Sequence, residues 1–561
     1  MPRPKTLAEL NKTNLELAKA DPHLAFTTYP EFLYPVFLRP CTVSILMVTD
    51  GGGSFTDADF GLTELLKVLA VSPGPFVRFA VTKAHRRTGG TGADIDNFRF
   101  DTTDLSSYDQ IWMIAVERGS GSITAAELRS ISDFMDAGGG VFATGDHEDL
   151  GVVMCGKIPR VRSMRRWHWP SPGPNGEPVA PHVDGLLRHD TNEKGYAAPT
   201  EFDDQSDDIP QTIRPKLYFT ASPFFFREYV YPHPVLCGPK GVIRHLPDHP
   251  HEGDCYVPSD LTKTFTFSGK TFTEYPALAG GSRLAPEVIA WSSNGPGISD
   301  ASKGTVSPLS FGAIGAYDGH QVNVGRVVVD ATWHHFFNIN LKGDPSSPDP
   351  AKRNGFYASS PNGTAEYAEI KAYFRNIAVW LATPERHRCM RWRALWASRW
   401  YSRLLMDFRP YKSLADIPLV EFIRLGTVAR DVLGRLASQC QSLQWIFDWI
   451  IDLQIRPELL RPVHPWPPQP DPPPDPAPEF DPVLTYYAHA LVNASLGAIL
   501  YTLADRHSNV TEALRKRLER GEDRSVIEEG VKLGTGRVFE AARASRHELE
   551  TLLKLAQDRS S

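Results

Sequence analysis

The stretch that most constrains the fold is residues 138–151, Gly-Gly-Gly-Val-Phe-Ala-Thr-Gly-Asp-His-Glu-Asp-Leu-Gly. Residues 141–144 are few and apolar, which predicts a buried strand. Polar residues follow that strand at once: Asp146, His147, Glu148 and Asp149. In an open α/β sheet, ligands bind at the carboxyl edge of the strands. The stretch therefore predicts a functional site at this strand end.

Strand and helix patterns alternate around this stretch. Runs rich in apolar and β-branched residues at 42–49, 76–81 and 109–116 predict three further buried strands. Apolar residues at helical spacing predict helices over 56–71 and 124–137. Such alternation is typical of a doubly wound parallel sheet with helices on both faces.

Two further elements are expected before Pro384. Residues 310–316 and 325–332 lie on either side of an Asp-Gly turn and predict a hairpin whose second strand ends at His334 and His335. Residues 364–383 predict an amphipathic helix that Pro384 ends.

Shifts in composition divide the 561 residues into regions. We expect an N-terminal arm (1–39), an α/β domain (40–384) with a large irregular insertion (152–310), a helical module (385–461), a proline-rich linker (462–482) and a helical C-terminal region (483–561). The linker has eleven prolines and should be extended. The C-terminal helices could support a homo-oligomer or bind a protein partner.

Composition argues against several protein classes. The formal net charge of −6 offers no basic excess for nucleic acid or an anionic membrane. Six cysteines without C-x-x-C spacing argue against a zinc ribbon and a disulfide scaffold. The first 26 residues lack the apolar core of a signal peptide, and no uncharged apolar run reaches the roughly 20 residues of a membrane span. A cytoplasmic protein is therefore expected.

Polar residues at four strand ends are the candidate catalytic groups. The carboxyl ends of parallel strands share one edge, so the following should converge: Asp50, Glu117, Asp146, His147, Glu148, His334 and His335. Alternation along an extended chain sends His334 and His335 to opposite sides, so only one of them should face a ligand. Histidine suits acid–base work because its unperturbed pKa lies near 6.5.

A second histidine group lies in the insertion. His249, His251 and Glu252 belong to the segment Asp-His-Pro-His-Glu-Gly-Asp, and imidazole and carboxylate are suitable ligands for Zn, Mn or Fe. The alternative is a surface loop with solvated histidines.

Substrate-binding groups are expected on two loops. In the first loop Asp50 is a candidate substrate-binding residue, and Gly51 and Gly52 could expose backbone N–H groups beside it, although they match no phosphate-binding motif. Arg166 and Trp167 could bind a sugar or an anion, because arginine offers paired donors and tryptophan packs on apolar sugar faces. The alternative for the latter pair is a solvated basic loop with its aromatics turned inward.

No covalent nucleophile is evident. The fourth strand is not followed by Gly-x-Ser-x-Gly, and Cys155 lies several residues beyond the turn. Acyl transfer through serine or cysteine is therefore disfavoured.

The order of these motifs resembles the class I glutamine amidotransferase-like superfamily, and within it the trehalose-utilisation (ThuA-like) proteins. The motifs are Thr-Asp-Gly-Gly-Gly, Ser-Tyr-Asp-Gln-Ile, Ala-Gly-Gly-Gly-Val-Phe-Ala-Thr-Gly-Asp-His and Gly-Arg-Val-Val-Val-Asp-Ala-Thr-Trp-His-His, within residues 40–384. The resemblance implies a flavodoxin-like sheet, a histidine site at His147 and at His334 or His335, and a link to sugar metabolism. The amidotransferase cysteine is missing at the turn, which argues against glutaminase activity.

We therefore expect a hydrolase or related lyase that acts on a small polar, carbohydrate-like substrate, with a divalent metal as a candidate cofactor. The rival interpretation is a ligand-sensing or scaffold protein whose α/β domain binds without turnover and whose helices bind partners.

Overall fold

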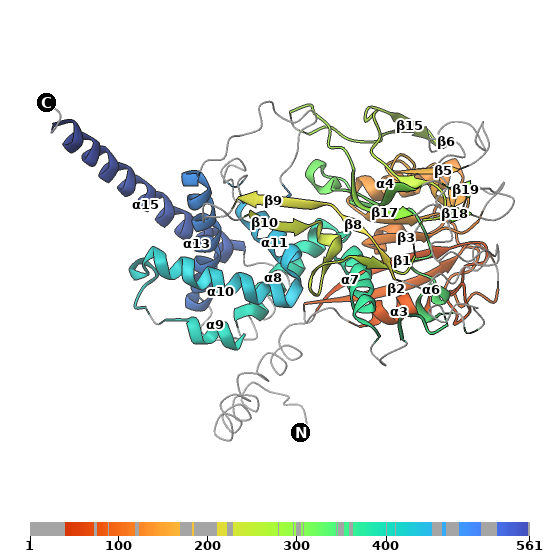
Figure 1. Ribbon diagram of the computed structural model, residues 1–561, viewed down its shortest axis with the longest axis horizontal. Coiled ribbons are helices and arrows are strands. Elements are labelled where there is room, and N and C mark those ends of the chain that lie inside the picture. Colours follow the sequence, from red (N-terminus) through yellow and green to blue (C-terminus); the bar gives the residue numbers. More distant parts are fainter. Residues whose placement is uncertain are drawn as a thin grey trace, which may run out of the picture.

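The architecture was taken from a computed structural model of the chain (Figure 1). It describes residues 40–558 apart from these positions: 72–75, 88, 118–122, 148, 169–181, 184–209, 222–227, 249, 279, 295–296, 299–304, 307, 344, 346–352, 358–362, 400, 410, 452–459, 461–462, 467–481 and 507–523. The expected N-terminal arm and most of the expected proline-rich linker lie outside the described residues.

An eight-stranded sheet organises the α/β part of the molecule. Its strand order is β2-β1-β3-β4-β21-β20-β17-β8. The bounds are β1 Cys41–Thr49, β2 Val77–His85, β3 Gln110–Ile114, β4 Gly140–Thr144, β8 Arg214–Pro215, β17 Glu287–Asn294, β20 Leu309–Tyr317 and β21 Val327–Asp330. The α/β class is thereby confirmed.

The sheet is mixed, whereas the sequence predicted a parallel one. β2, β1, β3, β4 and β21 run parallel to one another. β20 and β21 form the expected hairpin, which reverses the chain, so β20 is antiparallel to β21. β17 and β8 then extend the antiparallel half.

Side-chain alternation along the strands builds a hydrophobic core on each face of the sheet. In β1, Ile45 and Met47 point into one core, while Leu46 and Val48 point into the other. The first core includes side chains of α3 (Thr63–Ala70) and α7 (Ala365–Trp380), and the second includes α4 (Ala125–Asp136). Helices therefore cover both faces, as expected.

Local sequence explains where these helices begin and end. Thr124 caps α4 and forms a reciprocal capping box with Glu127. Pro384 follows the end of α7 and is the first residue of α8 (Pro384–Arg399), a position that tolerates proline because it needs no N–H donor. Two short helices complete the α/β part: α5 Val152–Cys155 and α6 Asn338–Lys342.

The described part of the insertion is more regular than expected. Its strand β17 joins the central sheet, and short strand pairs surround it. Their bounds are β5 Arg165–His168, β6 His182–Val183, β7 Gln211–Thr212, β9 Leu217–Ala221, β10 Glu228–Pro232, β11 Cys237–Gly238, β12 Gly241–Val242, β13 His245–Leu246, β14 Asp254–Cys255, β15 Thr264–Phe267, β16 Lys270–Thr273, β18 Gly297–Ile298 and β19 Thr305–Val306. Strands of two to five residues are too short to show a clear alternation in sequence.

The C-terminal region is helical, as expected. Its elements are α8, α9 Ser402–Asp407, α10 Leu419–Ala437, α11 Gln439–Ile451, α13 Pro482–Arg506 and α15 Arg524–Asp558. Side chains of α8, α10, α11 and α13 belong to the same hydrophobic core as Ile45 and Met47 of β1. Within the described residues, Tyr486–Arg506 of α13 is long and apolar enough to cross a membrane, but 83% of its apolar window is buried in the protein. A core helix has the same properties.

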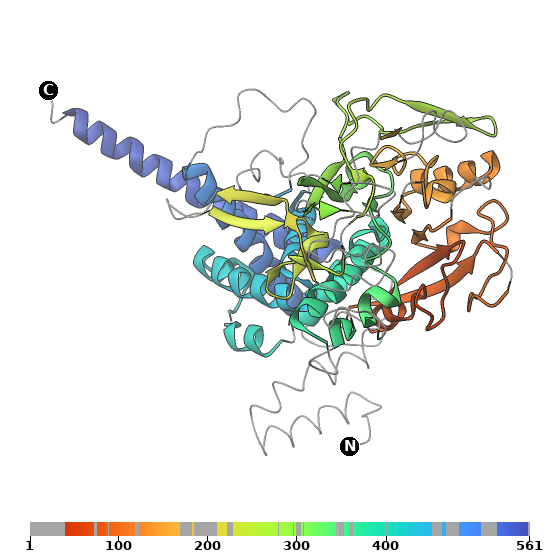
Figure 2. The ribbon, with the colours of Figure 1, turned by 45° about the vertical axis from the view of Figure 1, so that its right-hand side comes forward.

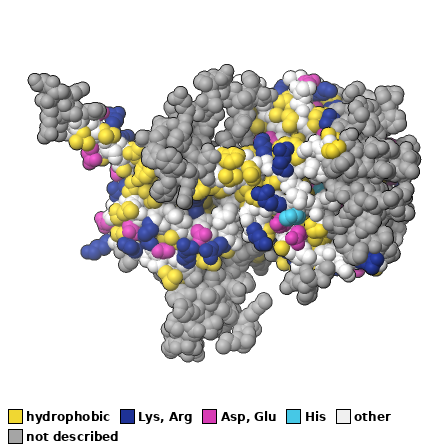
Figure 3. All heavy atoms as spheres, in the orientation of Figure 1, with side chains coloured by type: hydrophobic (Ala, Val, Ile, Leu, Met, Phe, Trp, Pro, Cys, Tyr) yellow, Lys and Arg dark blue, Asp and Glu magenta, His cyan; other side chains and the backbone are white. Residues whose placement is uncertain are grey.

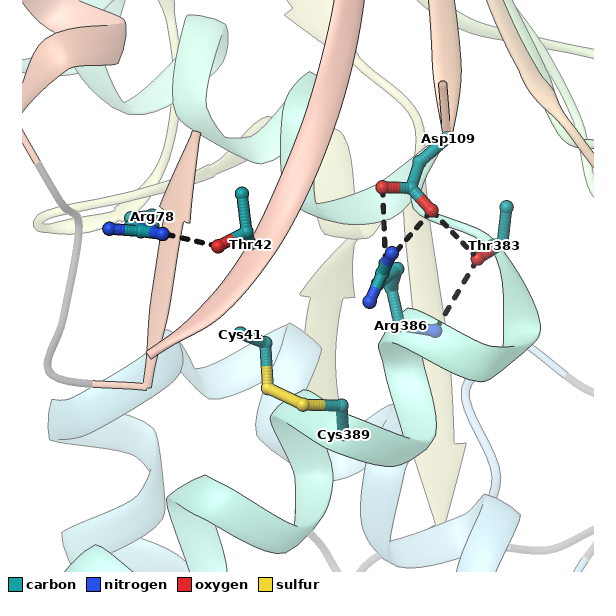
Figure 4. Close-up of a disulfide and its surroundings, with 7 residues drawn as sticks. All are labelled: Cys41, Thr42, Arg78, Asp109, Thr383, Arg386 and Cys389. Carbon is teal, nitrogen blue, oxygen red and sulfur yellow. Dashed lines mark hydrogen bonds and ion pairs between the residues drawn. A yellow bond between two sulfur atoms is a disulfide. The ribbon is translucent and has the colours of Figure 1, made fainter. Parts of the chain in front are cut away.

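A disulfide joins the sheet to the helical region (Figure 4). It links Cys41, at the start of β1, to Cys389 in α8, across 348 residues of sequence. The cysteine spacing did not reveal this pair, because only the packing of α8 against β1 brings the two residues together. The other four cysteines are free and buried.

Candidate metal centre

Four side chains with potential metal-ligand atoms meet at the carboxyl edge of the sheet. Asp146 and His147 follow β4, His334 follows β21, and His251 comes from the loop between β13 and β14. One potential ligand atom from each residue lies within 4.8 Å of the others. Asp146, His251 and His334 are buried and His147 is half-buried, so the group is closed except at His147.

Three imidazole rings turn a nitrogen toward the centre of this group. Nε2 of His147 lies 3.0 Å from Nδ1 of His251 and 3.4 Å from Nε2 of His334. The same Nε2 of His334 lies 2.7 Å from Oδ2 of Asp146. Ligand atoms around a tetrahedral zinc ion with bonds near 2.0–2.1 Å are separated by about 3.3 Å. The spacing is therefore compatible with one small cation among the four side chains.

Asp248 lies behind two of the rings. Its Oδ2 lies 3.5 Å from Nε2 of His251 and 3.5 Å from Nδ1 of His334, the nitrogens that point away from the centre. Histidines that bind metals usually have the second nitrogen held by a carboxylate or carbonyl, which fixes the ring orientation. Asp248 lies at that position beside both rings, and Nδ2 of Asn340 also lies 3.4 Å from Nδ1 of His334.

The environment of Asp146 keeps its carboxyl group ionised. Burial would raise its pKa, but the neighbouring His334 and His147 and the 2.6 Å hydrogen bond from Thr332 Oγ1 together lower the pKa below its ordinary value. The backbone N–H of His251 also donates to Oδ1 of Asp146, at 3.3 Å. An ionised carboxylate among imidazoles is a donor set that suits Zn, Mn or Fe.

A buried arginine connects the three loops that carry the cluster. The Arg165 guanidinium donates to the carbonyl oxygens of Asp146, Glu252 and Ala331 at 2.8–3.2 Å. These carbonyls belong to the loops after β4, before β14 and after β21. Arg165 is fully buried, and burial lowers its pKa. Its hydrogen bonds hold the loops in one arrangement.

The structure separates the two adjacent histidines. His334 joins the cluster, whereas His335 turns to the other side, where Nδ1 lies 2.8 Å from Oδ2 of Asp330 and Nε2 donates to the carbonyl of Asp248. Tyr373 donates to the same Oδ2 of Asp330. His335 thus supports the Asp248 loop from behind.

The other residues predicted near these histidines are Glu252, Glu148 and His249. Glu252 is buried next to His251 but is not among the four clustered residues. The predicted sites Glu148 and His249 lie outside the described residues.

The predicted groups after β1 and β3 form a separate arrangement on the same edge. Oδ1 of Asp50 accepts hydrogen bonds from the backbone N–H groups of Val116 and Glu117. Burial, together with the negative charge of Glu117, raises the pKa of Asp50 to about 6. The Glu117 side chain is paired with Arg87. Gly51 has a positive φ of 54° and lies against Glu117, while Gly52 is exposed.

The predicted sugar-binding pair has structural partners. Arg166 makes a two-point ion pair with Asp254 at 2.7 and 2.8 Å. Trp167 is fully buried under the Arg165 guanidinium and donates to the carbonyl of Leu150. Its ring lies in the core, so its faces are not at a surface.

Cys155 does not offer an activated thiol. It is fully buried, and burial together with the charge of Asp50 raises its pKa well above the ordinary value. A thiol is nucleophilic as the thiolate, so a raised pKa makes it inert.

Asp248, Arg165 and Thr332 were not among the predicted site residues. Asp248 stands three residues before His251 and Thr332 two before His334, so both were adjacent in sequence to predicted ligands. Arg165 gave no such signal, because its segment holds four arginines and only folding shows which of them contacts the loops of the cluster.

In comparisons with known proteins, no family model, no curated protein and no solved structure matches the chain.

Proposed function

We propose that the protein is a metal-dependent hydrolase, or a related lyase, that acts on a small polar, carbohydrate-like substrate. The observation that carries the proposal is the inward convergence of His147, His251, His334 and Asp146, with ligand atoms within 4.8 Å of one another. Clusters of histidine and carboxylate on strand-end loops are typical of metal-assisted catalysis.

The donor set favours zinc, manganese or iron. Three neutral imidazoles and one carboxylate suit these ions, whereas calcium and magnesium prefer oxygen ligands. A divalent ion held there would act as a Lewis acid toward a polar group of the substrate. The buried Asp248 behind the rings supports this assignment, because such a carboxylate orients the ligands and increases their basicity.

The protein's own residues would restrict access to one side. His147 is the half-buried member of the cluster, while the buried Trp333 ring stacks on His334 at a centroid distance of 4.2 Å and closes another side. A substrate would therefore approach past His147. Arg165 would hold the ligand-bearing loops while the substrate binds.

The proposed substrate class rests on the resemblance to ThuA-like proteins. The order of the parallel strands, β2-β1-β3-β4-β21, supports a flavodoxin-like sheet, which has the order 2-1-3-4-5. In this proposal the cluster takes the place of the amidotransferase nucleophile, so the chemistry is acid–base or metal-assisted instead of covalent.

Metal analysis of the purified full-length protein tests the cofactor. We expect about one equivalent of Zn, Mn or Fe per chain, as for a single mononuclear site. His334→Ala and His251→Ala should lose the metal, whereas His245→Ala should retain it, because His245 pairs with Glu369 outside the cluster. Wild-type protein that takes up no divalent metal would contradict the proposal.

Turnover is tested separately, with p-nitrophenyl glycosides and p-nitrophenyl acetate as probes. We expect hydrolysis that chelation abolishes, that added metal restores, and that His334→Ala lacks. Stoichiometric metal without hydrolysis of either probe would instead favour the ligand-sensing interpretation.

A further inference from the structure

Helix α15 has two halves with different surroundings. In the first half, Gly530 and Gly534 face α13 so closely that an added Cβ would lie 2.4 Å from Cα of Ile499 and 2.6 Å from the carbonyl oxygen of Ala494. This close packing fixes the first half of α15 to the body of the protein.

The second half projects away from the body (Figures 1 and 2). The side chains of residues 543–550 are all exposed. From Phe539 to the end of the helix at Asp558 the rise is about 30 Å. Helices in proteins are stabilised mainly by packing of an apolar face. Among the described residues, this half has no such packing.

The projecting half nevertheless carries an apolar stripe. Phe539, Leu549 and Leu552 are 42%, 60% and 61% exposed, and Figure 3 shows hydrophobic side chains along this helix between basic and acidic ones. In the sequence, positions at alternating spacings of three and four form a heptad pattern: Phe539, Ala542, Arg546, Leu549, Leu553 and Ala556. This spacing is that of a coiled-coil seam.

We propose that the projecting half of α15 pairs with the same half of a second copy of the chain in an antiparallel coiled coil. Charge favours this partner and direction. Residues 537–547 hold three arginines and one glutamate, a net charge of +2, and residues 548–558 hold one lysine, two glutamates and one aspartate, a net charge of −2. An antiparallel copy brings each basic part against an acidic one.

The seam residues select the same direction. In an antiparallel register centred between positions 547 and 548, Arg546 lies opposite Leu549, Phe539 opposite position 556, and Ala542 opposite position 553. In the central layers, Leu549 of each copy packs on the aliphatic stem of Arg546 of the other. A parallel pair would place Arg546 against Arg546 in the seam, which repulsion disfavours.

Light scattering of the full-length chain across a range of concentrations tests the pairing. We expect a dimer, and Leu549→Glu/Leu552→Glu should make it monomeric with unchanged circular dichroism. The matched control Ala544→Glu/Thr551→Glu adds two charges to the opposite face and should stay dimeric. A wild-type chain that is monomeric at every concentration would overturn the proposal, even if the chain bound lipid vesicles. Equal effects of the two double variants on the oligomeric state would overturn it as well.

Oxidative cross-linking tests the direction. Ala542→Cys/Leu553→Cys should form a covalent dimer, and Ala542→Cys alone should not, because the two copies of position 542 are about 16 Å apart along an antiparallel pair. Efficient cross-linking through Ala542→Cys alone would show a parallel pair and overturn the proposal.

Discussion

The carboxylate of Asp248 lies 3.5 Å from Nδ1 of His334, on the side of the ring that faces away from the clustered ligands. The same oxygen lies 3.5 Å from Nε2 of His251. A single buried acid therefore lies beside the outer nitrogens of two of the three clustered histidines.

This relationship predicts a loss of metal affinity when the charge on Asp248 is removed. Asp248→Asn should weaken metal binding by about 10–100-fold, the usual effect of removing a carboxylate behind a ligand histidine. Competition with a chromogenic chelator would measure it. Asp318→Asn is the matched control, because it removes a carboxylate that forms an ion pair with Arg326 at the opposite edge of the sheet. Equal metal affinities of the wild type and Asp248→Asn would contradict the assigned role.

Arg165→Lys should loosen the loops around the cluster. The lysine ammonium places its donors on one compact nitrogen and lacks the planar fork with which the guanidinium reaches the three carbonyls. We expect the free energy of unfolding of the metal-free protein to fall by about 2–4 kcal/mol, measured by urea denaturation. Arg166→Lys should cost less, since its ion pair with Asp254 is partly exposed. The reverse order would count against the role of Arg165.

His233 predicts a stability loss in mild acid. Burial lowers its pKa to about 4, from an ordinary value near 6.5. Between these values the unfolded chain binds a proton that the folded chain does not, so stability falls as the pH drops from 6.5 to 4, by about 1.4 kcal/mol per pH unit.

The variant His233→Asn isolates this effect. Asparagine can still accept the hydrogen bond that Val235 N–H donates to His233. Unfolding curves at several pH values should then show a free energy of unfolding whose pH dependence is weaker by one proton. An unchanged slope would mean that His233 does not titrate in this way.

The disulfide predicts sensitivity to reductants. The bond between Cys41 and Cys389 closes a long loop, so its loss should lower the free energy of unfolding by on the order of 4 kcal/mol. Thermal unfolding with and without dithiothreitol would measure the change, and Cys41→Ser/Cys389→Ser should not respond. Thiol titration of the unfolded, unreduced chain should find four reactive cysteines; six would contradict the pairing.

Much of the α/β part could be predicted because its signals are local. An apolar run followed by polar residues indicates a strand and its end, so β1, β3, β4 and β21 and the edge that carries Asp146, His147 and His334 follow from short stretches of sequence. The antiparallel half of the sheet could not be predicted in this way. β17 lies in a segment rich in turns, and its place beside β20 depends on contacts distant in sequence.

The sequence by itself determined the residue types and the sheet edge at which they meet. Tertiary structure alone decided which of them face one another. His335 is held by Asp330, to which Tyr373 also donates, while the adjacent His334 faces Asp146. The fold brings His251 to His147 across 104 residues. Backbone alternation specifies that two neighbouring side chains diverge, but which one enters the site depends on the partners of the other. One partner of His335, the Asp248 carbonyl, is 87 residues away in sequence.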